Sequence, residues 1–161
     1  MQKTKHILLI SCLIFLSGVV FANPSPTQNK LSPVGYWKTI DDISGKPKAI
    51  VQIWKSSDQK LYGKVVQLFN RDPHVRCKTC VGEKQNQPIV GMTILNHFKP
   101  DQNQVATWNG GSILDPKNGK VYHSTMRVLS NGKQLSVRGY IGIPLFGRSQ
   151  VWERVNLAAL S

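Results

Sequence analysis

The spacing of turn residues limits the fold of this chain more than any other feature. In residues 108–154, stretches that alternate apolar and polar side chains are separated by the sequences DPKNG (residues 115–119) and SNGK (residues 130–133). Asn and Gly tolerate positive φ, so both sequences favour hairpin turns. We therefore predict strands at residues 120–129, 134–141 and 148–155. The alternation points one apolar set inward: Tyr122, Met126, Val128, Leu135, Val137 and Ile141.

The first half of the chain shows the same pattern. Strands are predicted at residues 34–40, 47–54 and 60–69. The second directs Ala49, Val51 and Ile53 inward, and the third directs Leu61, Gly63 and Val65 inward. A polar excursion without periodicity follows at residues 70–88, and the apolar run at residues 89–98 fits either a strand or one helical turn.

These segments predict an all-β domain at residues 34–155. The sequence contains no heptad pattern, long amphipathic helix or internal repeat. About eight or nine short strands joined by short turns favour a single antiparallel up-and-down β-barrel, because closure removes the exposed edges of an open sheet.

The N-terminus has the features of a secretory signal peptide. Lys3 and Lys5 precede an apolar run at residues 7–21, and the small residues Val20 and Ala22 suit cleavage by signal peptidase. We expect cleavage after Ala22, a loose leader at residues 23–33, a tail at residues 156–161, and export to the periplasm or the medium, with no membrane span after processing. An uncleaved signal anchor is the alternative. A lipid anchor at Cys12 is not expected, because most of the apolar run follows that residue.

Two longer motifs connect the chain to a known family. The patterns W-x-G-G-x-I-x-D-P-x-x-G-x-x-Y and R-G-Y-x-G-x-P-L-x-G-R-x-Q-x-W-x-R both lie in residues 108–154. They resemble the exported bacterial proteins grouped as DUF2147, a family of undefined function. The resemblance extends over most of residues 33–155 and implies the fold and export, but no catalytic residue.

A second resemblance concerns the two ends of the domain. Gly35-Tyr36-Trp37 opens the first predicted strand, and Arg154 closes the last. This arrangement is similar to the lipocalin and calycin pattern, in which a late arginine packs on an early tryptophan where the barrel closes. An indole face and a guanidinium attract each other by roughly 0.5–2 kcal/mol. The resemblance implies a structural role for Trp37 and Arg154.

Cys77 and Cys80 are the only cysteines that remain after cleavage. Outside the cytoplasm they are expected to form a disulfide that staples the polar excursion. Two alternatives stay open. One is a redox-active C-x-x-C pair, and the other is a metal site with His74, completed by His97 or His123.

The charge of the chain predicts an affinity for anionic surfaces. Removing the first 22 residues, with their two lysines and no acids, lowers the net charge from +13 to +11. Outside the cytoplasm this charge favours lipid headgroups or polysaccharide, and we expect no nucleic-acid partner. A basic interaction protein that docks on anionic lipid, polysaccharide or another protein is therefore one functional candidate. A solvated, charged barrel exterior with no partner is the simpler explanation.

The leading functional hypothesis is a binding protein rather than an enzyme. The sequence lacks a nucleophile elbow and a phosphate loop, so we expect no enzymatic activity, no cofactor and no metal. If the barrel interior is not filled, it could hold a small apolar or amphipathic ligand in the cell envelope. The expected cavity residues are Val51, Ile53, Val65, Tyr122, Met126, Val137 and Ile141, with Arg127, Arg138 and Tyr140 near a mouth.

Overall fold

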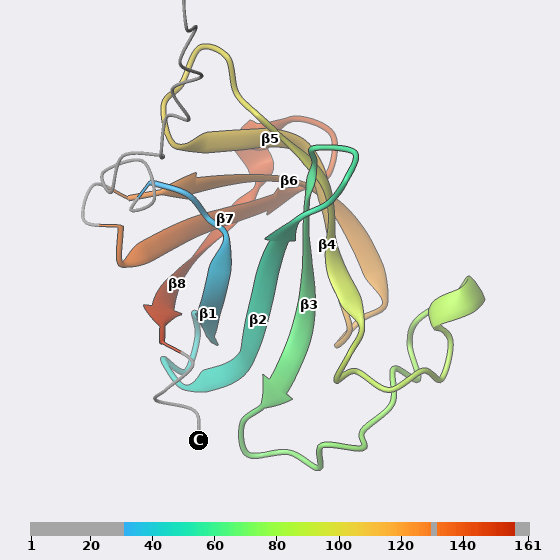
Figure 1. Cartoon of the computed structure of the whole chain (residues 1–161). Helices are drawn as coiled ribbons and strands as arrows, with labels where there is room; N and C mark the ends of the chain where they lie inside the picture. Colours follow the sequence, from blue (N-terminus) through green and yellow to red (C-terminus); the bar gives the residue numbers. More distant parts are fainter. Residues whose placement is uncertain (1–30, 130–131, 157–161) are drawn as a thin grey trace, which may run out of the picture.

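The computed structural model describes residues 31–129 and 132–156, which form one closed antiparallel barrel (Figure 1). Its eight strands follow each other in chain order, and β8 pairs with β1 to close the barrel. The all-β barrel prediction is therefore confirmed. The strands are β1 (Gly35–Ile40), β2 (Pro47–Lys55), β3 (Leu61–Leu68), β4 (Thr93–Pro100), β5 (Thr107–Asp115), β6 (Lys120–Val128), β7 (Gln134–Tyr140) and β8 (Arg148–Val155).

The sequence predictions for residues 1–30, including the signal peptide and Cys12, lie outside the described residues. The same is true of residues 157–161 and of Ser130 and Asn131 in the predicted 130–133 turn. Among the described residues, no helix has the length and apolar character needed to cross a bilayer.

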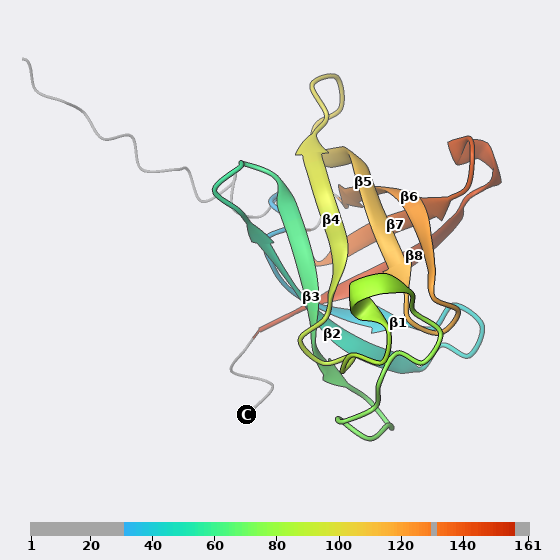
Figure 2. The same cartoon turned by 90° about the vertical axis from the view of Figure 1, so that its right-hand side faces the viewer.

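The up-and-down topology sorts the connections between two ends of the barrel. One end, which we call the closed end, carries residues 31–34, 56–60, 101–106, 129 and 132–133. The other, which we call the open end, carries residues 41–46, 69–92, 116–119 and 141–147. The longest connection joins β3 to β4 and contains the 3-10 helix η1 (Gly82–Lys84). Figure 2 shows this connection in green, lying over the ends of the neighbouring strands.

Two predicted segments differ from the structure. The run at residues 89–98 forms β4 only from Thr93, so the helical-turn alternative is wrong. Ile141 was predicted to point inward, but it follows β7 and is 67% exposed. The physical reason is a chain reversal directly after it, where Gly142 adopts a φ of 74°.

Large side chains fill the half of the barrel next to the closed end. Trp37, Leu95, Phe98 and Met126 are each no more than 1% exposed. Glycines on neighbouring strands make room for two of them: a Cβ on Gly63 would lie 2.7 Å from Leu95 Cδ1, and one on Gly111 would overlap the ring of Phe98. The β5–β6 register also shifts between Trp108 and Gly111, as in a β-bulge.

Candidate functional site

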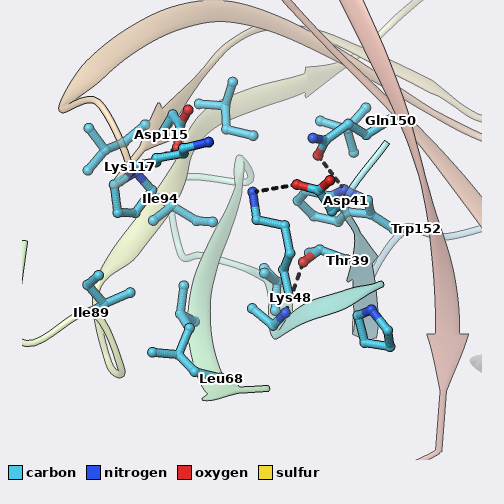
Figure 3. Close-up of a pocket in the computed structure, with 18 of the residues that line it drawn as sticks. Thr39, Asp41, Lys48, Leu68, Ile89, Ile94, Asp115, Lys117, Gln150 and Trp152 are labelled. Carbon is cyan, nitrogen blue, oxygen red and sulfur yellow. Dashed lines mark hydrogen bonds and ion pairs between the residues drawn. The ribbon is translucent and has the colours of Figure 1, made fainter. Parts of the chain in front are cut away.

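The half of the barrel next to the open end is hollow. A pocket of about 620 Å³ opens there to solvent (Figure 3). Its deep wall is apolar and comes from strands around the whole barrel: Val51 (β2), Val65 (β3), Ile94 (β4), Val137 (β7) and Trp152 (β8). Leu68, Ile89, Ile113 and Leu114 extend this apolar lining.

Five cationic side chains surround the pocket, and we call them the rim cations: Lys46, Lys48, Arg71, Lys117 and Arg148. Lys48 Nζ lies 3.7 Å from Asp41 Oδ2, and Arg148 forms an ion pair with Asp42. Within residues 31–129 and 132–156, the other three rim cations have no carboxylate within 4.0 Å. The mouth therefore carries positive charge that the described part of the chain does not neutralise.

The carboxylate of Asp41 belongs to the β1–β2 turn as well as to the rim. The backbone N–H of Ser44, 2.8 Å away, is the largest cause of its low pKa, followed by the Ser44 hydroxyl at 2.9 Å. The N–H of Ile43 and the charge of Lys48 act in the same direction, and the pKa falls to about 2. Asp41 is thus anionic at neutral pH and is held by its own turn, as expected for a turn residue.

Polar side chains inside the pocket already have hydrogen-bond partners. Thr39 Oγ1 accepts from the N–H of Ala49 at 3.1 Å. Gln150 Oε1 accepts from Trp152 Nε1 at 3.2 Å, and Tyr122 Oη accepts from Asn118 Nδ2 at 3.0 Å. These bonds help to fix the orientation of the wall, and the rim cations supply the positive charge that could pair with an anionic ligand atom.

The structure brings four of the sequence-predicted cavity residues to the pocket: Val51, Val65, Tyr122 and Val137. Ile53 and Met126 point inward as predicted, but they lie in the filled half and do not line the pocket. Their strands run toward the closed end at those positions, so the cavity occupies only part of the predicted interior.

The residues predicted for the mouth lie elsewhere. Arg127 is exposed on β6 and Tyr140 packs against His123, with ring centroids 5.7 Å apart. Arg138 donates to the carbonyl oxygens of Pro144 and Leu145 at 2.8 and 3.2 Å. The alternation explains these positions, because Met126 and Val137 take the inward sites next to the two arginines.

The sequence prediction missed the rim cations and Trp152. Trp152 could have been found by alternation, since Arg154 reaches inward to Trp37 and the residue two positions earlier shares its face. The rim cations could have been found by counting strands, because every second connection of an up-and-down barrel lies at the same end. Lys46, Arg71 and Lys117 lie on three different connections that an up-and-down barrel brings to the same end.

Trp37 and Arg154 meet at the closed end. The Arg154 guanidinium carbon lies 4.2 Å from the Trp37 ring centroid. Its nitrogens donate to the carbonyl oxygens of Gly132, Val34 and Ser32 at 2.7, 3.0 and 2.5 Å. Burial lowers the pKa of Arg154 from its ordinary value. The contact ties the first and last strands to the chain that precedes β1.

The C-x-x-C pair is a disulfide in the β3–β4 connection. Cys77 and Cys80 are 1% and 3% exposed, so the disulfide is shielded from solvent. Thr79 Oγ1 donates to the carbonyl oxygen of Pro116 at 3.0 Å, and this bond holds the disulfide loop against the β5–β6 turn. In the described ranges, no three His, Cys, Asp or Glu side chains gather as metal ligands would.

Two comparisons with known proteins agree with this architecture. Residues 35–154 match the model of DUF2147, described as an uncharacterized protein conserved in bacteria. A solved structure of protein HP1028 from Helicobacter pylori, described as belonging to the lipocalin family, is similar to this chain with a TM-score of 0.69. The two are 18% identical, and the similarity covers 80% of this chain and 86% of that one. No curated protein matches the chain.

Proposed function

This chain belongs to the DUF2147 family and has a lipocalin-like barrel, and we propose that its pocket binds a small amphipathic molecule with one apolar chain and an anionic head group. The lipocalin-like barrel and the family match suggest a binding fold rather than a catalytic one. Support for the ligand class comes from the pocket itself, which is apolar at depth and cationic at its mouth.

The shape of the pocket sets the orientation of the proposed ligand. A volume of about 620 Å³ lies in the range of roughly 300–1,000 Å³ that is usual for small-molecule sites. The apolar chain lies against Leu68, Phe69 and Ile113, which line the pocket and are partly exposed, and burial of its methylene groups supplies most of the affinity. The head group stays at the rim, within reach of Arg71 and Lys117, so the ligand charge remains close to water.

We propose that this binding takes place in the cell envelope. The signal-like features of residues 1–22 support export. The disulfide between Cys77 and Cys80 supports an oxidising compartment, where such bonds persist. Localisation can be measured directly by fractionating cells that express the full chain and following the loss of the N-terminal segment by mass spectrometry. Full-length protein retained in the cytoplasm would contradict it.

Two ligands with the same alkyl chain test the proposal. Dodecanoate and dodecan-1-ol differ at the head group, and each can be titrated against the purified barrel by displacement of a fluorescent fatty-acid analogue. We expect both to bind and dodecanoate to bind about tenfold more tightly, the size of one favourable charge interaction at a partly solvated site. Failure of both ligands to bind would overturn the proposal, and equal affinities would overturn its anionic head group.

A charge reversal at the rim separates the head-group contact from the general charge of the protein. Lys117→Glu should weaken dodecanoate binding by roughly fivefold or more and leave dodecan-1-ol unchanged. Lys55→Glu is the matched control, because Lys55 is exposed on β2 near the closed end and does not line the pocket. Equal weakening by both variants would show that only the net charge matters.

A further inference from the structure

The loop between β7 and β8 exposes an unusual concentration of apolar side chains. Ile141, Ile143, Leu145 and Phe146 are 67%, 55%, 76% and 80% exposed. The remaining large apolar residues that the described ranges leave exposed, such as Val81 and Val105, are isolated in the sequence. Figure 2 shows this loop in red-brown, projecting from the barrel at the upper right. A soluble barrel gains nothing from presenting such a cluster to water, so the cluster calls for a partner surface.

The loop is held in this shape by the barrel behind it. Residues Pro144–Phe146 form the 3-10 helix η2, with the N–H of Gly147 donating to the carbonyl oxygen of Pro144 at 3.0 Å. Arg138 donates to the carbonyl oxygens of Pro144 and Leu145, and to Ser149 Oγ at 2.9 Å. A Cβ at Gly147 would lie 2.8 Å from the carbonyl oxygen of Gly139, so the loop base packs directly on β7. The loop therefore already has its shape in the free protein, so contact with a partner costs little conformational entropy.

The charge around the loop identifies the kind of partner. The loop lies at the open end, and Gly139 and Arg148, which flank it, both line the pocket. The mouth beside it carries five cations against two carboxylates among its lining residues, and the whole chain has a net charge of +13. An apolar tip next to clustered Lys and Arg complements a bilayer surface with anionic headgroups, where apolar side chains enter the interface and cations meet phosphate.

We propose that the β7–β8 loop inserts Leu145 and Phe146 into the interface of an anionic bilayer. The rim cations then face the headgroups, and the pocket mouth lies at the membrane surface. This docking does not require that the pocket hold a ligand. If the pocket does bind an amphipathic molecule, the same geometry gives that molecule a short path between bilayer and barrel.

Vesicle flotation tests the docking. The purified barrel is mixed with vesicles of phosphatidylglycerol and phosphatidylethanolamine, or with vesicles of phosphatidylcholine alone. We expect binding to the first and at least about tenfold weaker binding to the second, because the cationic contribution is lost. Part of the binding to anionic vesicles should persist at high salt, since screening acts on charges and not on inserted apolar groups. Equal binding to both vesicles, or no binding to either, would overturn the proposal.

A pair of matched double variants assigns the contact to the loop. Leu145→Asp/Phe146→Asp should lower binding to anionic vesicles by at least about tenfold. Val105→Asp/Val151→Asp introduces the same charge at two exposed apolar positions outside the loop, and it should lower binding by less than about threefold. Equal losses in the two variants would overturn insertion by the loop.

The same variants keep this inference separate from the function of the pocket. Leu145 and Phe146 do not line the pocket, so the loop variant should keep its dodecanoate affinity in solution. An unchanged circular dichroism spectrum and melting temperature would show that it remains folded. If the wild type does not bind dodecanoate, only the proposed ligand is contradicted. If the wild type does not bind anionic vesicles, only the docking is contradicted.

Discussion

Arg154 is held by several kinds of contact at once. It stacks on Trp37, and its guanidinium meets three backbone carbonyl oxygens from two separate segments. Arg154→Ala should lower the free energy of unfolding by roughly 2–4 kcal/mol, because the cation–π contact is lost and partly buried carbonyl groups lose their donors. Arg154→Lys should recover less than half of this loss, since an ammonium group cannot reproduce the planar guanidinium and its several N–H donors.

Urea denaturation of the Arg154 variants gives these values, and Arg127→Ala is the control. Arg127 is exposed on β6, so its truncation should change stability by no more than about 0.5 kcal/mol. If Arg154→Ala were as stable as Arg127→Ala, the stacking on Trp37 would have no role in closing the barrel.

Asp41 links stability to pH through its turn. Its pKa is lowered from 3.8 to about 2 in the folded chain, so the unfolded chain takes up a proton first as the pH falls. The carboxylate therefore stabilises the fold above about pH 4, and this contribution is lost between about pH 4 and pH 2. Asp41→Asn should be less stable than the wild type near pH 6 and should approach it near pH 2. Urea denaturation at both values measures the difference, and a constant gap would contradict the linkage.

At the scale of elements, the β3–β4 connection depends on its contact with the β5–β6 turn. Gly119 has a φ of 72°, and a Cβ there would overlap the carbonyl oxygen of Thr79. Gly119→Ala should therefore release the disulfide loop from the turn. We expect the amide hydrogens of Cys77, Asn86 and Ile89, which bond within the connection, to exchange at least about tenfold faster.

Gly142 provides a matched control for this effect. It has a φ of 74°, and no heavy atom lies within 4 Å of the position that a Cβ would take, so Gly142→Ala adds the backbone strain without the clash. Both variants should lose roughly 1–2 kcal/mol from positive φ. Only Gly119→Ala should speed exchange in the β3–β4 connection. The same acceleration in Gly142→Ala would mean that the contact between the two elements is unimportant.

At the scale of the whole molecule, the predictable part of the fold was the local part. Alternation at β2, β3, β6 and β7 placed the inward residues correctly, with Ile141 as the exception where β7 ends. Closure followed from the number of strands and the absence of helices. The arginines at 127 and 138 were placed at a mouth for their charge, although the alternation of their own strands directs them outward.

The division of the interior could not be read from one strand at a time. Whether a barrel is filled depends on side chains that meet from different strands, such as Phe98 of β4 over Gly111 of β5. The rim likewise forms only when closure brings separate connections together, as it does for Arg71 and Lys117. Both features are properties of the tertiary arrangement, and neither leaves a periodic signal in the sequence.

The filled and hollow halves of the barrel predict opposite responses to the same enlargement. Val128 and Val137 are both 2% exposed, but only Val137 lines the pocket. Val128→Phe should lower the free energy of unfolding by roughly 1–3 kcal/mol, because the filled half has no space for the ring. Val137→Phe should cost less than about 1 kcal/mol, since the ring can enter the pocket, and it should weaken dodecanoate binding about tenfold. Urea denaturation and ligand titration measure the two effects. Equal destabilisation by both variants would mean that the half of the barrel next to the open end is closed in solution and offers no room for a ligand.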